Sequence, residues 1–118
     1  MDYINPALAL LTIILGAFGF LAPRYTMGAL DFETTKSTMG LSELRAGSGG
    51  LFVAVGIWCL FTGDAYAYFM LGVAYVGAGA GRALSIIIDK PPLKKALVFL
   101  AFEWPPAAWL IWANWPTY

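Results

Sequence analysis

Residues 65–81, with the sequence AYAYFMLGVAYVGAGAG, form a run of 17 residues without a charged side chain. An α-helix needs about 20 residues to cross the hydrocarbon core of a bilayer, so this run requires only a few flanking residues to span a membrane. Three other stretches resemble it, and of these only the last contains a charge, that of Glu103. They are residues 6–22, 46–62 and 96–113. The sequence therefore predicts four membrane-spanning helices.

The predicted helices cover residues 5–23, 42–62, 65–88 and 93–115. Four spans use about 80 residues of the 118, which leaves too little chain for a separate soluble domain. The expected fold is an all-α integral membrane bundle of four transmembrane helices, a single domain over residues 1–118. We expect the first span to be retained rather than cleaved as a signal peptide, because no basic residue precedes Arg24.

The composition excludes several classes of function. The chain is 60% hydrophobic and 12% charged, with a mean hydropathy of +0.72, whereas soluble domains are about 25% charged. A net charge of zero without a basic block gives no electrostatic footprint for nucleic acid. The absence of histidine excludes His-dependent triads and His-ligated zinc, haem or chlorophyll. The single cysteine, Cys59, excludes an internal disulfide and a multi-cysteine metal site.

The basic residues predict the orientation of the chain. Apart from Arg82, all lysines and arginines lie within residues 24–45 and 90–95. The positive-inside rule places these two connections in the cytoplasm and both termini on the non-cytoplasmic side. Aromatic residues gather at the opposite helix ends, as in an interfacial belt: Tyr3, Trp58, Tyr66, Tyr68, Trp112, Trp115 and Tyr118. The long connection, residues 24–41, is either a short interfacial helix or irregular chain.

Arg82 and Glu103 are charged residues inside apolar spans. They lie at equal distances in sequence from the Pro91-Pro92 connection, so a helical hairpin places both about 10–15 Å from the membrane boundary. An unpaired charge near the middle of a bilayer costs at least about 2.5–3.5 kcal/mol, and pairing offsets much of this cost. We therefore predict an Arg82–Glu103 ion pair. The alternative is that Arg82 snorkels to the headgroups and Glu103 is protonated or faces a helix dipole.

Further polar residues are expected in the same half of the membrane. A stripe at helical spacing on the third helix should face the bundle; it consists of Tyr75, Ala78, Arg82, Ser85 and Asp89. Near the start of the second helix, the side chains of Glu43 and Arg45 are two residues apart and should point to nearly opposite sides. The candidate site is Glu43, Arg45, Arg82, Ser85, Asp89 and Glu103. It is either a structural network tying three helices together or a pocket for an anionic or amphipathic ligand such as a lipid headgroup.

Local signals predict helix ends and helix contacts. Asn5 before a proline predicts the N-cap of the first helix, and Asp64 after Gly63 predicts that of the third. Gly77 and Gly81 form a small-xxx-small pair through which the third helix should pack closely.

The fourth helix carries two further signals. Pro105 and Pro106 lack backbone donors, so they should kink this helix and free carbonyls near residues 101 and 102 to accept from Arg82 or water. Three tryptophans at a spacing of three should form a ridge towards lipid or a partner: Trp109, Trp112 and Trp115.

Several of these residues occur together in a known pattern. GLSELRA at residues 40–46 followed by Gly49-Gly50, GRALS at residues 81–85 followed by Asp89, and the embedded Glu103 resemble a family of small bacterial membrane proteins. That family is a domain-of-unknown-function group with four predicted transmembrane helices, and the likeness covers nearly the whole chain. It implies that the six candidate-site residues are the shared polar set and that the chain resides in the bacterial inner membrane. Lys90 stands where the family pattern has glycine, and the family brings no activity with it.

Three classes of function are compatible with the sequence. The first is a non-enzymatic structural or accessory subunit that packs against a larger membrane protein complex or a second copy, because the chain is small and lacks a nucleophile–base pair. The second is binding or transport of an anionic lipid, quinone or other amphiphile at the polar cluster. The third is an enzyme acting on a lipid-soluble substrate, with Glu103 or Asp89 as acid or base. Membrane lipids are partners in all three, and the identity of any cofactor is left open.

Overall fold

The computed structural model describes residues 3–116, and every regular element in that range is a helix. Four helical stretches are long and apolar enough to cross a membrane: Ile4–Leu21, Met39–Thr62, Ala65–Ile88 and Leu93–Ala113. The predicted all-α fold with four candidate spans is therefore confirmed. The contacts divide the chain into two compact units, Met1–Thr62 and Gly63–Tyr118, and its organisation as a single domain stays a prediction.

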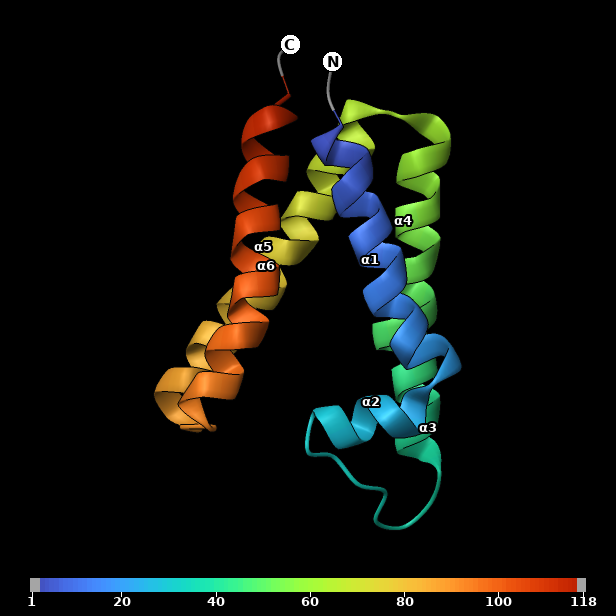
Figure 1. Cartoon of the computed structure of the whole chain (residues 1–118), viewed down its shortest axis with the longest axis vertical. Coiled ribbons are helices and arrows are strands. Elements are labelled where there is room, and N and C mark those ends of the chain that lie inside the picture. Colours follow the sequence, from blue (N-terminus) through green and yellow to red (C-terminus); the bar gives the residue numbers. More distant parts are fainter. Residues whose placement is uncertain (1–2, 117–118) are drawn as a thin grey trace. The chain divides into compact units, whose positions relative to one another are not determined.

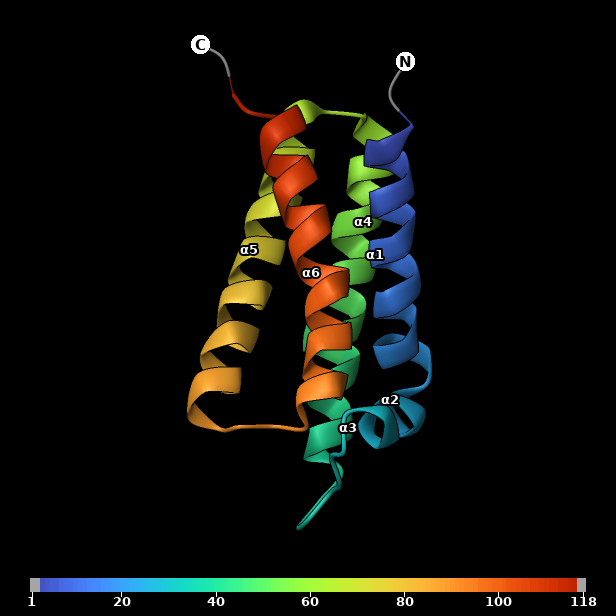
Figure 2. The ribbon, with the colours of Figure 1, turned by 60° about the vertical axis from the view of Figure 1, so that its left-hand side comes forward.

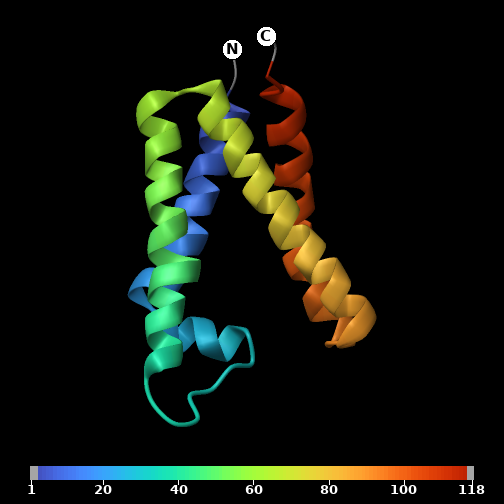
Figure 3. The same ribbon diagram turned by 180° about the vertical axis from the view of Figure 1, so that it is seen from behind.

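The first unit is built on two long antiparallel helices. Its elements are α1 (Ile4–Leu21), α2 (Pro23–Ala29), α3 (Met39–Glu43), the π-helical segment η1 (Leu44–Gly50) and α4 (Leu51–Thr62). The last three follow one another without a break and lie beside α1 (Figure 1; Figure 3). The short helix α2 lies across one end of this pair (Figure 1), so the long connection begins as a helix and continues as irregular chain.

The start of α1 differs from the prediction. The helix begins at Ile4 with Tyr3 in the N-cap position and no side-chain cap, so the expectation that Asn5 caps it was wrong. The physical reason lies in Pro6, which is the third helical residue. The first amides of a helix have no intrahelical acceptor, so a proline there removes no hydrogen bond and the helix can start before it.

The end of α1 follows from a second proline. A residue that precedes proline avoids the helical region of backbone space, and Ala22, with φ −132° and ψ 60°, leaves the helix. Pro23 then occupies the first position of α2, where its missing N–H costs nothing. This break redirects the chain from α1 into α2.

The two long helices of the first unit meet at glycines. A β-carbon added to Gly16 would lie 3.0 Å from the Gly49 carbonyl oxygen, and one added to Gly56 would lie 2.6 Å from Ile13 Cγ1. A β-carbon on Gly49 itself would overlap the backbone of Phe20. The two backbones therefore approach as closely as small residues allow, which is how membrane helices gain van der Waals contact.

The second unit is a hairpin of two long helices, α5 (Ala65–Ile88) and α6 (Leu93–Ala113), which lie side by side and are joined by residues 89–92 (Figure 2). The predicted cap at its start is confirmed, because the Tyr66 amide donates to the Asp64 carboxylate at 3.1 Å. At the other end of α5, Lys90 adopts a left-handed backbone with φ +51° and its amide donates to the Ser85 carbonyl at 3.2 Å.

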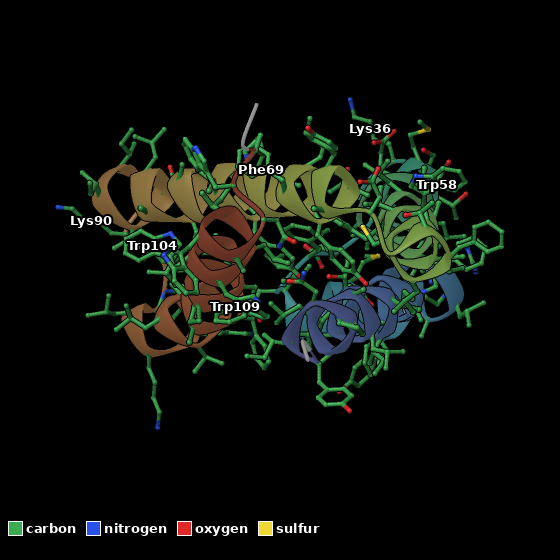
Figure 4. All side chains as sticks on the ribbon, turned by 90° about the horizontal axis from the view of Figure 1, so that it is seen from above. Lys36, Trp58, Phe69, Lys90, Trp104 and Trp109 are labelled. Carbon is green, nitrogen blue, oxygen red and sulfur yellow. The ribbon has the colours of Figure 1, made fainter. Side chains whose placement is uncertain are left out.

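The glycines that bring α5 and α6 together are not the predicted ones. A β-carbon on Gly72 would lie 2.8 Å from Leu110 Cβ, and one on Gly79 would overlap the indole of Trp104, which lies between the two helices (Figure 4). No atom lies within 4 Å of a β-carbon at Gly77 or Gly81, so α6 does not pack against that pair, and close packing through it stays a prediction. Each residue turns a helix by about 100°, so positions two residues from Gly79 point to nearly the opposite side.

Candidate functional site

The predicted ion pair is present in the second unit. Arg82 of α5 donates from Nη2 to Glu103 Oε2 of α6 at 2.9 Å and from Nε to Oε1 at 3.2 Å. Two parallel bonds of this kind fix the guanidinium plane against the carboxylate and are stronger than a single contact. The side chains are 31% and 14% exposed, respectively, so the acid is the more enclosed partner. The matching depth inferred from the sequence is the reason that the two groups meet.

The surroundings of the pair on α6 include an aromatic ring and two prolines. The Arg82 guanidinium carbon lies 5.1 Å from the centre of the Phe99 ring, a cation–π contact one helical turn before Glu103. On the C-terminal side, α6 remains helical through Pro105 and Pro106, although its course bends about midway (Figure 1). The described hydrogen bonds of Arg82 go to Glu103 rather than to carbonyls near residue 101.

Ser85 and Asp89 form a separate contact at the end of α5. The Ser85 hydroxyl donates to Asp89 Oδ2 at 2.9 Å. The stripe to which they belong does not face one interior, because Tyr75 is buried whereas Ala78 and Asp89 are exposed. The prediction that the whole stripe points inward was therefore wrong. An α-helix repeats every 3.6 residues, so a stripe that spans four turns drifts away from a single neighbour.

Glu43 and Arg45 belong to the first unit, where their side chains have different surroundings. Arg45 donates from Nη1 to the Phe20 carbonyl oxygen at 2.7 Å. That carbonyl is in the last turn of α1, where main-chain acceptors lack intrahelical donors and a cation is favoured. Glu43 is exposed at the end of α3, and its side chain makes no hydrogen bond or ion pair in the described structure. The divergent directions expected from their spacing agree with these surroundings.

Five of the six candidate residues thus form two contacts in the second unit and a helix-end contact in the first, and Glu43 takes part in none of them. Whether they act as one site stays a prediction. Within residues 3–116 no group of three or more acidic or cysteine side chains is placed to hold a metal ion. The arrangement around Arg82 and Glu103 can fix two helices to each other and can present a partly exposed guanidinium to a polar group.

Sequence reasoning missed two contributors. The first is Trp104, which fills the space beside Gly79, and the second is the Phe20 carbonyl, which accepts from the predicted site residue Arg45. The first was accessible from spacing, because Gly79 precedes Arg82 by three residues and Trp104 follows Glu103 directly. The second needed the pairing of α1 with η1, which no local pattern reveals.

The tryptophans of α6 divide between contact and exposure. Trp112 and Trp115 are 74% and 63% exposed, whereas Trp109 is half-buried and its ring lies 5.4 Å from that of Trp112. Trp115 also contacts the ring of Phe69 edge-on at 5.6 Å. Of the predicted ridge, Trp112 and Trp115 are therefore exposed, while Trp109 packs beside Trp112.

Four apolar helices in a chain of 118 residues define a small, multi-pass, all-helical membrane protein. The family described as "Domain of unknown function (DUF4345)" matches residues 5–114, and the chain belongs to this family. The resemblance inferred from the sequence motifs to a domain-of-unknown-function family is thereby confirmed. No curated protein and no solved structure matches the chain.

Proposed function

We propose that the protein is a non-enzymatic accessory subunit that packs within the membrane against a larger membrane protein complex. The observation that carries this proposal is a face of α5 that α6, its neighbour in the same unit, does not cover. It consists of Ala74, Gly77, Ala78 and Gly81, all exposed and spaced at one helical repeat, and we call it the open α5 face. Small residues let a partner backbone approach, and such contacts drive helix association in lipid.

The charges support the same proposal. The embedded acid, Glu103, is bound twice by Arg82, and Asp89 accepts from Ser85. Both carboxylates proposed for acid–base chemistry are therefore engaged by neighbouring side chains. This arrangement favours a role in holding the hairpin, with recognition left to the outer surface.

The test places a bulky side chain on the open α5 face. Gly77→Leu should leave the hairpin folded, since no atom lies within 4 Å of a β-carbon there, and should reduce recovery of the partner complex by tenfold or more. Ala108→Leu, at an exposed small residue of α6, is the matched control. Purification in mild detergent with mass spectrometry, combined with a photo-crosslinker at Ala78, measures the association. A solitary monomer with no crosslinked partner contradicts the proposal, and crosslinks only between copies redirect it to a homo-oligomer.

A second candidate is binding of an anionic lipid, quinone or other amphiphile near Arg82. Its supporting observation is the 31% exposure of the Arg82 side chain beside a stretch of α6 where Pro105 and Pro106 cannot donate to the carbonyls of residues 101 and 102. Native mass spectrometry of the purified protein tests it, with Arg82→Gln expected to lose the retained molecule. Retention unchanged by that substitution rejects this candidate.

We also propose that the protein lies in the bacterial inner membrane with both termini on the non-cytoplasmic side. The distribution of Lys and Arg supports this orientation. Reporter fusions after residue 118 and within residues 30–37 test it. A cytoplasmic signal from the C-terminal fusion contradicts the proposed orientation.

A further inference from the structure

The connection between α5 and α6 concentrates positive charge. Residues 89–95, which we call the lysine tip, contain Lys90, Lys94 and Lys95 against one carboxylate, Asp89. The Asp89 carboxylate accepts the Ser85 hydroxyl at 2.9 Å. Lys90 and Lys94 are exposed, and Lys90 projects away from the helices in Figure 4. The lysine tip therefore has a net charge of +2, and two of its three lysines, Lys90 and Lys94, are exposed.

The residues that flank the lysine tip place it at a membrane surface. Ile87, Ile88 and Leu93 are 71%, 64% and 57% exposed. These apolar side chains lie at the ends of helices long and apolar enough to span a bilayer, so they favour the hydrocarbon edge. The neighbouring ammonium groups then lie at the depth of the headgroup phosphates, which lysine side chains reach readily.

The backbone at Lys90 adds a second observation. Its φ of +51° lies in the left-handed region, which is unfavourable for a residue with a β-carbon and costs glycine little. Lys94 and Lys95 lie in the first turn of α6, which contains no acidic residue and where the helix dipole disfavours cations. Lysines thus occupy positions that local structure disfavours, and an anion bound beside the first turn of α6 offsets the electrostatic part of that cost.

The corresponding connection of the first unit has no such excess. Residues 24–45 contain three basic residues, Arg24, Lys36 and Arg45, and three acidic ones, Asp31, Glu33 and Glu43. Its net charge is zero. A mixed-charge segment has no general preference for an anionic surface, whereas each unmatched lysine near one contributes an attraction.

We propose that the lysine tip is a binding site for the phosphates of anionic phospholipid headgroups. This inference goes beyond the accessory role and does not depend on it, because the open α5 face is not part of the tip. The lipid phosphate lies between the ammonium groups of Lys90 and Lys94, and the lipid chains lie along the exposed Ile87, Ile88 and Leu93.

The experiment measures lipid binding by native mass spectrometry of the full chain in mild detergent. The probes are dioleoylphosphatidylglycerol and dioleoylphosphatidylcholine, titrated separately. The test variant combines Lys90→Gly with Lys94→Gln, and the matched control is Lys36→Gln, an exposed lysine of the first unit. Circular dichroism verifies helix content, and Lys94→Gln alone provides a second variant that leaves the Lys90 turn untouched.

We expect the wild type to bind the anionic lipid about tenfold or more tightly than the zwitterionic one. Each lysine contributes about a fivefold factor, so the double variant should weaken anionic-lipid binding by roughly 25-fold and the control by less than twofold. Equal binding of both lipids by the wild type overturns the proposal, as does an equal loss in the control. Displacement of the lipid by millimolar inorganic phosphate also overturns it, because the site would then recognise free phosphate.

Discussion

In the first unit, α1 meets η1 and α4 backbone to backbone at glycines, whereas in the second unit α5 and α6 are joined by side chains that reach across. A β-carbon added to Gly16, Gly49 or Gly56 would come too close to atoms of the facing helix. In the second unit, Arg82 binds Glu103 through two hydrogen bonds, and the indole of Trp104 occupies the space beside Gly79. Both pairs are antiparallel and both are apolar.

The difference shows two ways in which helices associate where the hydrophobic effect does not drive their association. Lipid is as apolar as leucine, so association depends on close van der Waals contact or on polar groups that satisfy each other. The first unit depends on how near two backbones come, and the second on charges that have no better partner nearby. Substitutions that act on one mechanism should leave the other unit unaffected.

The largest expected effect is loss of the ion pair. Arg82→Ala or Glu103→Ala leaves one charge without its partner, and breaking a buried pair costs about 3–5 kcal/mol in soluble proteins. Water entry or protonation of the acid can lower this figure in a membrane. The double variant should recover part of the loss, which a double-mutant cycle on unfolding in mixed detergent micelles measures. Additive losses would falsify the coupling, and Ser85→Ala is the control for a contact at the exposed end of α5.

Next in size is the backbone contact of the first unit. Gly49→Ala places a methyl group on the Phe20 backbone, which cannot move without separating the helices, so we expect a loss of about 3 kcal/mol in unfolding free energy. Gly47→Ala, which meets no atom within 4 Å, is the matched control and should be neutral or stabilising. Equal losses for both variants would show that the glycines matter for backbone conformation and not for helix contact.

A smaller loss of stability is expected where a side chain, rather than a backbone, occupies the space beside a glycine. Gly79→Ala forces the Trp104 indole to shift, and a side chain yields more readily than a backbone, so a loss of about 1–2 kcal/mol should follow. Gly77→Ala should instead stabilise the helix by up to about 1 kcal/mol. Tryptophan fluorescence during unfolding reports both. If Gly77→Ala proves the more harmful variant, the contact face of α5 is misassigned.

The smallest expected effect has the opposite sign. Lys90→Gly removes the cost of a left-handed backbone at φ +51° and should raise the unfolding free energy by about 1 kcal/mol. Lys90→Ala retains a β-carbon and should give no such gain, which separates the backbone from the loss of charge. Thermal unfolding of the three proteins in one detergent makes the comparison. A gain of equal size in the alanine variant would assign the effect to charge.

Much of the fold could be predicted because its signals are local. Runs without charge mark the four spans, and their ends differ from the predicted ones by at most three residues, as in Met39 against residue 42. The Asp64 cap and the break before Pro23 follow from residue chemistry at a single position. Asn5 failed as a cap because a proline at any of the first helical positions removes no hydrogen bond, so the helix can begin before Pro6, with Tyr3 in the N-cap position.

The candidate site, too, could be predicted only in part. The Arg82–Glu103 pair could be predicted because a hairpin of two helices makes depth a function of distance along the chain. The helix-end contact of Arg45 could not, since it depends on which carbonyl of α1 comes to lie beside η1. The glycines show the same limit: spacing identified a small-residue face on α5, but not which face α6 would cover.

The sequence by itself determined that this is a four-span helical membrane protein with one embedded ion pair, because charge, apolar run length and distance from a turn each act along the chain. Only the tertiary structure decided the rotation of each helix about its axis. That rotation placed Gly79 and not Gly77 against α6, brought Arg45 to the Phe20 carbonyl and left the open α5 face uncovered by α6. In an apolar helix the residues of different faces are chemically alike, so the choice depends on the fit of two whole surfaces rather than on any one residue.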